Sequence, residues 1–76
     1  MNISDDAIRA AVSMIRVGMS RVRMDEVRHR NDLRMALADS ALVRAGVPEA
    51  CQRLIDNDEA LIAEMQAAID GLKESP

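Results

Sequence analysis

Four arginines stand seven residues apart in the first half of the chain: Arg9, Arg16, Arg23 and Arg30. On a straight helix a seven-residue repeat drifts by only about 20° per step, so all four guanidinium groups would line one edge. Guanidinium groups pair with carboxylates and phosphates, and this edge is where a coiled coil carries the charges that select its partner. We therefore take this arginine row as a candidate partner-binding surface.

Three partners could meet the arginine row: the last helix of the same chain, an acidic surface of another protein, and nucleic acid. The last predicted helix offers it four acids, Asp56, Glu59, Glu64 and Asp70. Nucleic acid is disfavoured because no aromatic residue interleaves with the arginines and because the chain has a net charge of −3. We expect pairing with the last helix first, an acidic protein second and nucleic acid third.

Glu26 and His29 form a second constellation, because they lie one helical turn apart. Di-iron carboxylate bundles use this spacing to aim two ligands inward. A metal would also need a carboxylate from a facing helix, and folding the chain about residue 46 places Glu64 opposite His29. Charged neighbours favour a solvated bend, so we expect a structural or surface role and no metal, with a pH-sensitive contact of His29 as the other alternative.

Covalent catalysis has little support in the sequence. The single cysteine, Cys51, falls on an apolar seam where a free thiol is usually a small buried side chain. The single histidine lies on a different predicted helix, and neither a glycine-rich phosphate loop nor a zinc-ligand spacing occurs. We expect a protein that is not an enzyme and binds no cofactor.

The cysteine count and the apolar runs predict a location. One cysteine forms no internal disulfide, which fits a reducing compartment. The N-terminus is acidic where a signal peptide would be basic, and no purely apolar run exceeds four residues. We expect a cytoplasmic protein without a membrane-spanning segment.

The first element that would position these residues is a helix over residues 5–24. Apolar residues recur there every three or four positions, from Ile8 to Val22, behind Ser4 or Asp5 as an N-cap. This period is typical of the apolar face of an amphipathic helix. The arginine row lies directly beside that face.

Beyond the first helix the apolar stripe turns polar at Glu26 and His29. Either the helix bends over residues 25–31, or these two side chains face something polar. Residues 32–45 are apolar on nearly all sides, which predicts a centrally buried second helix. Gly46 then supplies a helix end and Pro48 a helix restart. A tight turn at this point should reverse the chain.

The last helix is predicted over residues 48–72. Its apolar seam steps by four and three residues throughout and contains one acid, Asp58. Either the helix breaks at Asp56, which fits a capping box with Glu59, or it runs on and Asp58 is paired. The continuous helix is the expected form. Mirror counting about the turn pairs Asp58 with Arg34, or else with the arginine row of a second chain, so Asp58 joins the candidate partner-binding residues.

Residues 38–55 resemble the helix-turn-helix of transcriptional regulators through Ala45, Gly46 and Val47, which precede a polar helix start. In that motif the second helix reads bases from its N-terminal end. Here that end offers one candidate base-reading side chain, Arg53, among several acids that would repel phosphate. The resemblance therefore does not predict DNA recognition.

Together these elements predict one all-α domain over residues 1–76, an antiparallel hairpin or three-helix unit. A chain this short buries only roughly 60% of its unfolded surface. Residues 1–46 carry eight arginines against six acids (+2), and residues 47–76 carry two basic residues against seven acids (−5). We expect the chain to complete a bundle with a partner, most simply as a homodimer in which opposite charges meet.

The residues that stand out belong to helix faces and not to a pocket. The sequence therefore predicts a small non-enzymatic protein–protein binding module: an adaptor, a co-chaperone or an inhibitor of a larger complex, including a phage-encoded one. Residues 33–72, with Gly46 and Pro48 in the turn, resemble the small helical co-chaperones of type III secretion needle subunits in helical spacing, which assigns no family. The alternative function is a nucleic-acid-associated regulator that uses the arginine row.

Overall fold

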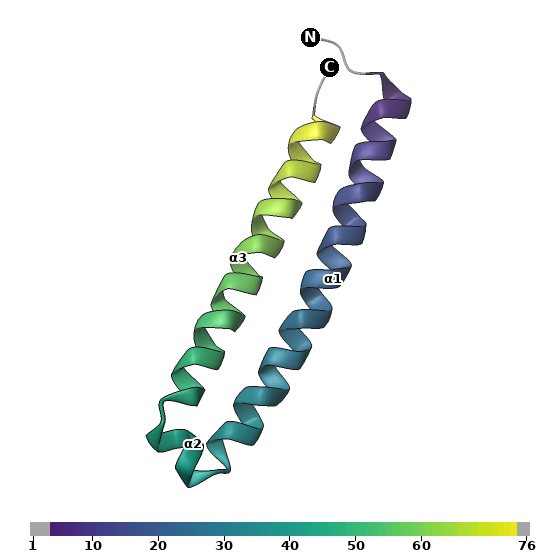
Figure 1. Ribbon diagram of the computed structural model, residues 1–76. Helices are drawn as coiled ribbons and strands as arrows, with labels where there is room; N and C mark the ends of the chain where they lie inside the picture. Colours follow the sequence, from purple (N-terminus) through teal and green to yellow (C-terminus); the bar gives the residue numbers. More distant parts are fainter. Residues whose placement is uncertain (1–3, 75–76) are drawn as a thin grey trace.

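The fold is a helical hairpin (Figure 1). A computed structural model describes residues 4–74, which form α1 (Asp5–Leu37), α2 (Ser40–Arg44) and α3 (Val47–Lys73) and contain no strand. α1 and α3 run antiparallel, and α2 lies in the turn between them. The Cα atoms span 56 × 15 × 11 Å, so the molecule is a rod two helices wide. The all-α prediction is confirmed.

α1 is longer than predicted. It begins after Ser4, whose hydroxyl accepts a hydrogen bond from the backbone N–H of Ala7 (3.2 Å), and it continues to Leu37. The prediction of separate helices over residues 5–24 and 32–45 is therefore wrong. No bend occurs between them, and the other alternative holds, because both polar positions of the stripe have polar partners. Glu26 approaches Arg30 on its own helix, and His29 bonds Asp58 on α3.

The buried second helix expected before the turn is also wrong. Asp39 has an extended backbone, and its carboxylate accepts hydrogen bonds from the N–H groups of Ala41 (2.9 Å) and Leu42 (3.3 Å). An aspartate that bonds nearby backbone groups in this way competes with a continuing helix. It starts the five-residue α2, in which no residue is buried. Ala41, Leu42 and Val43 of α2 are therefore exposed at the turn and do not belong to a buried helix.

Gly46 completes the chain reversal with φ 79° and ψ 17°, in the left-handed region. Glycine adopts this conformation without the Cβ clash that other residues meet. Pro48 follows in the first turn of α3, where its missing N–H is not needed. The predicted turn at residues 46–48 is confirmed, and α3 runs through Asp58 without a break.

The apolar core lies along the seam between α1 and α3. The buried apolar side chains come from both helices: Val12, Met19, Ala36, Cys51, Ile55 and Ile69. Cys51 is buried, as its place on the seam predicts. With one partner helix each, α1 and α3 keep their opposite faces exposed. None of the helices in residues 4–74 combines the length and apolarity that crossing a lipid bilayer requires.

Candidate partner-binding groove

The arginine row lies along one long side of the hairpin. Its members each follow a seam residue of α1 by one position, so all project to the same side of the seam. Glu59 lies on the same side of α3, because Arg30 contacts it. Gln66 and Lys73 continue the row of Glu59 at seven-residue steps, so they face the arginine row nearer the open end of the hairpin.

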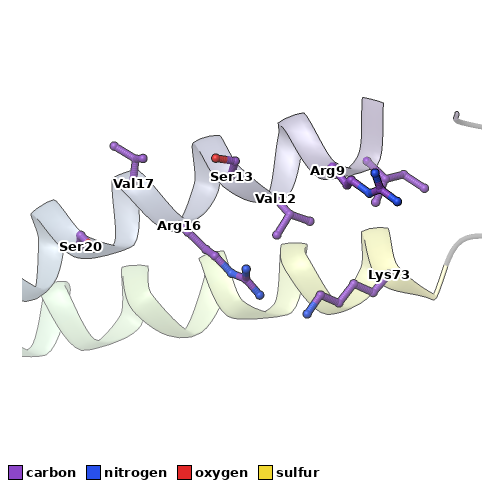
Figure 2. A pocket seen from close by; sticks show the side chains of 8 residues that line it. Arg9, Val12, Ser13, Arg16, Val17, Ser20 and Lys73 are labelled. Carbon is purple, nitrogen blue, oxygen red and sulfur yellow. The ribbon is translucent and has the colours of Figure 1, made fainter. Parts of the chain in front are cut away.

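A groove of about 630 Å³ runs along this side near the open end (Figure 2). It has apolar residues, two serine hydroxyls, and three cations from both long helices. The lining residues are Ile8, Arg9, Val12, Ser13, Arg16, Val17, Ser20 and Lys73. In Figure 2, Arg16 extends from α1 toward α3, while Lys73 extends along α3 toward Arg16. Cations from two helices therefore converge on one groove.

A second hollow of about 250 Å³ continues this groove toward the turn. It shares Arg16 and Ser20 with the first hollow and adds Arg23 and Gln66 to the polar lining. We name the two hollows together the basic groove. Three of the four arginines of the predicted row therefore line one continuous surface.

Within residues 4–74, the cations of the basic groove have no carboxylate partner. Within residues 4–74, no acidic oxygen lies within 4.0 Å of any of them: Arg9, Arg16, Arg23 and Lys73. The residues that line the two hollows include no acid. Like charges that converge repel one another, and a bound anion would relieve that repulsion. The groove is therefore suited to anionic groups that also carry apolar surface.

Arg30 differs from the rest of the row. Its guanidinium donates a hydrogen bond to Glu59 Oε1 on α3 (2.5 Å) and lies 3.7 Å from Glu26 Oε1 on its own helix. The expected pairing of the row with the last helix is confirmed at this position. Because Arg30 is already paired, its charge is less available to an outside partner.

The other acids predicted to meet the row do not reach it. Asp56 and Asp70 each accept a hydrogen bond from a glutamine four residues earlier on α3 (3.0 Å in both). Glu64 is exposed and makes no ion pair within residues 4–74. Pairing with the last helix therefore holds for Arg30 and fails for the arginines of the basic groove.

Asp58 lies in the hairpin interior and not on the basic side. His29 Nδ1 donates a hydrogen bond to Asp58 Oδ2 (2.6 Å), and the two side chains are 16% and 11% exposed. The predicted pair of Asp58 with Arg34 is wrong, because Arg34 donates to Asn31 Oδ1 on its own helix (2.5 Å). In the described chain, Asp58 links α3 to α1 through its hydrogen bond with His29.

The error in pairing comes from where the chain reverses. Folding about residue 46 would place Arg34 near Asp58, but the position midway between His29 and Asp58 is 43 or 44. The reversal lies earlier because residues 38–46 all belong to the turn instead of extending the paired helices. Every facing residue on α3 is therefore several positions away from the one that mirror counting predicts.

Glu26 and His29 do not aim at a common site. Glu26 approaches Arg30, whereas His29 bonds across the seam. The residue that faces His29 is Asp58 and not the predicted Glu64. Within residues 4–74, no three His, Cys, Asp or Glu side chains come close enough together to hold a metal ion.

Four polar residues of the basic groove were not marked by the sequence patterns: Ser13, Ser20, Gln66 and Lys73. The two serines carry no pattern of their own. Gln66 and Lys73 carry a usable signal, since they continue the seven-residue row of Glu59. In an antiparallel helix pair, rows that flank the seam on the same side face each other, so the α3 row could have been matched to the arginines.

Comparisons of the chain with protein-family models, with curated proteins and with solved structures found no match. The argument for function therefore rests on the geometry and charge of the basic groove.

Proposed function

We propose that this chain is a small non-enzymatic binding module that captures another protein through acidic side chains of that protein. The observation that carries the proposal is the basic groove, in which three arginines and Lys73 converge without a carboxylate partner in residues 4–74. An adaptor, a co-chaperone or an inhibitor of a larger complex would use such a surface in the same way.

The lining of the groove favours a protein partner over nucleic acid. Ile8, Val12 and Val17 lie among its cations, so the groove can hold an apolar side chain between flanking carboxylates. A partner helix that is both acidic and amphipathic offers this combination, whereas a phosphate backbone offers charge alone. The acids of α3 and the net charge of −3 also oppose a polyanion.

The test measures binding of a labelled amphipathic peptide with glutamates at seven-residue spacing, beside the same peptide with glutamine in their place. The full chain should bind the first peptide and not the second. Arg16→Glu should weaken binding by about tenfold or more, because one hydrogen bond to a charged group contributes about 1.5–3 kcal/mol. Arg53→Glu is the matched control, because Arg53 is exposed on α3 and does not line the groove.

Equal binding of both peptides, or equal losses in the two variants, would contradict a role for the groove. The competing function, a nucleic-acid-associated regulator, uses the same arginines. It predicts binding to generic duplex DNA with an affinity that falls steeply and linearly in a log–log plot against salt. Tighter binding to duplex than to the acidic peptide at physiological salt would replace our proposal with that one.

A further inference from the structure

The two faces of the hairpin that point away from the seam differ in side-chain size. The outer face of α1 consists of three exposed rows between positions 10 and 35. It carries five large apolar side chains that are 53–75% exposed: Met14, Val17, Met24, Val27 and Met35. The outer face of α3 carries small apolar side chains instead: Ala50, Ala60, Ala63 and Ala67. Large side chains on one face could pack against small ones on the other.

The same two faces carry opposite charge. Between positions 10 and 35, the outer face of α1 has three arginines and no acid: Arg21, Arg28 and Arg34. The outer face of α3 has one arginine, Arg53, and five acids: Glu49, Asp56, Glu64, Asp70 and Glu74. A surface of either kind is disfavoured against itself and favoured against the other.

We propose that the outer face of α1 in one copy of this chain docks on the outer face of α3 in a second copy. Size and charge both support this occupant, because arginines meet carboxylates and large side chains meet alanines. Alanines also let two helices approach closely, which increases the contact area of each methionine. The inference does not rest on the proposed function, since Met24 and Ala60 at the centre of this contact do not line the basic groove, although Val17 belongs to both surfaces.

One placement of the two helices brings the apolar members together. The second copy's α3 runs antiparallel to α1, as α3 does within the hairpin. With Met24 set on the second copy's Ala60, Val17 meets Ala67, because each lies seven residues from the central contact in opposite chain directions. The two apolar contacts therefore repeat on the same stripe.

The flanks of this placement carry complementary charges. Arg21 and Glu64 face each other on one flank, because they stand three and four residues from the central contact. At a rise of about 1.5 Å per residue, they differ by only about 1.5 Å along the axis. Arg34 and Glu49 face each other on the other flank, ten and eleven residues from the contact. None of these four residues has an ion pair within residues 4–74.

The contact is heterologous, because each copy binds one neighbour through the outer face of α1 and another neighbour through the outer face of α3. Such contacts continue into a row or close into a ring, and do not end at a dimer. A symmetric pair through like faces would bring arginine toward arginine or acid toward acid. The inference therefore differs from a simple homodimer in the number of copies that associate.

The experiment compares Met24→Glu and Ala60→Glu with the wild-type chain by sedimentation velocity over a wide concentration range. Both positions are exposed, so the hairpin should keep its helicity in circular dichroism. Wild type should grow beyond a dimer, and each variant alone should associate at least about tenfold more weakly. Met24→Glu places an acid against the acidic face of α3, and Ala60→Glu fills the space that Met24 needs. An equal mixture should form a 1:1 dimer and nothing larger, since one intact pair of faces remains.

Leu61→Glu is the control, because Leu61 is 43% exposed but lies on the long side opposite the basic groove, outside both outer faces. It should assemble as wild type does. A wild type that stays monomeric, one that stops at a dimer, or a Met24→Glu or Ala60→Glu variant that associates alone would overturn the inference. Arg16→Glu separates this inference from the proposed function, because it should lose the acidic peptide and still assemble.

Discussion

The two ends of the hairpin differ in whether the basic side chains of α1 have acidic partners on α3. Near the turn, two basic side chains of α1 contact acids on α3: His29 bonds Asp58 and Arg30 bonds Glu59. Near the open end, the cations of the basic groove have no carboxylate within 4.0 Å in residues 4–74. Paired side chains fix the register where the chain reverses, whereas the open end carries the cations on which the proposed function depends.

The difference has a simple origin in the sequence. Along α1 the row is arginine at every step, from Arg30 back to Arg9. Along the facing row of α3 the side chain changes from Glu59 to Gln66 to Lys73. The two rows therefore match in charge at the turn, become neutral against positive in the middle, and repel at the open end.

The largest effect is expected at the buried pair near the turn. Asp58→Ala should lower the free energy of unfolding by about 2–3 kcal/mol, because it leaves the His29 ring nitrogen unpaired in the seam and removes a bond to a charged group. Asp58→Asn keeps an acceptor and should lose less. Urea unfolding measures both values.

Asp70→Ala is the control for this prediction. Asp70 is exposed and accepts a hydrogen bond from Gln66 on its own helix, so its loss should change stability by less than about 0.5 kcal/mol. If Asp58→Ala destabilises no more than Asp70→Ala, then the His29–Asp58 pair does not hold the register. Pairing near the turn would then not explain how the two ends of the hairpin differ.

A smaller effect is expected at the turn itself. Gly46→Ala should destabilise the chain by about 1–2 kcal/mol, because a Cβ is strained at φ 79°. The new methyl group meets nothing closer than Glu49 Oε2 at 4.0 Å, so the loss reports backbone strain without a steric clash. Gly71→Ala, within a helix and with open space around the added Cβ, should stabilise or leave stability unchanged. A neutral Gly46→Ala would show that the turn does not constrain the pairing.

The helical periods and the turn were predictable from the sequence, but the pairing across the hairpin was not. The seam residues from Ile8 to Leu72 and the Gly46 turn follow from local spacing and backbone preference. Facing residues depend on the number of residues that the turn consumes. Asp39 starts a short capped helix inside the turn, and this moves the reversal away from residue 46.

Of the two alternatives for the first half, the bend was wrong for the same reason. Glu26 and His29 interrupt the apolar stripe, and nothing near His29 in the sequence marks Asp58 as its partner. Folding of the hairpin brings Asp58 to His29, whereas Glu26 approaches Arg30 one turn further along its own helix. The arginine row was predictable as a surface, but the groove also needed Lys73, whose place opposite the row follows from the antiparallel pairing.

The exposed pair near the turn should have a modest effect. Arg30 and Glu59 are 54% and 53% exposed, so solvent screens their attraction and the pair should contribute about 0.2–1 kcal/mol. Arg30→Ala, Glu59→Ala and the double variant form a cycle that isolates this coupling by urea unfolding. A coupling of zero would make Arg30 equivalent to the groove arginines and weaken the contrast between the ends.

The smallest effect, and one of opposite sign, is expected at the open end. Arg16→Gln removes a charge that has like-charged neighbours in the groove and no acidic partner in residues 4–74, so stability should rise by at most about 0.5 kcal/mol.

Salt sharpens the comparison, because at about 1 M the screening length falls to roughly 3 Å. Higher salt should stabilise the wild-type chain more than Arg16→Gln, since it screens a repulsion that the variant lacks. It should weaken the Arg30–Glu59 coupling in the same medium. Urea unfolding at low and high salt gives both quantities. If Arg16→Gln destabilises the chain by more than about 1 kcal/mol at both salt concentrations, then Arg16 stabilises the hairpin. The cations at the open end would then have a structural role, which contradicts the difference proposed between the two ends.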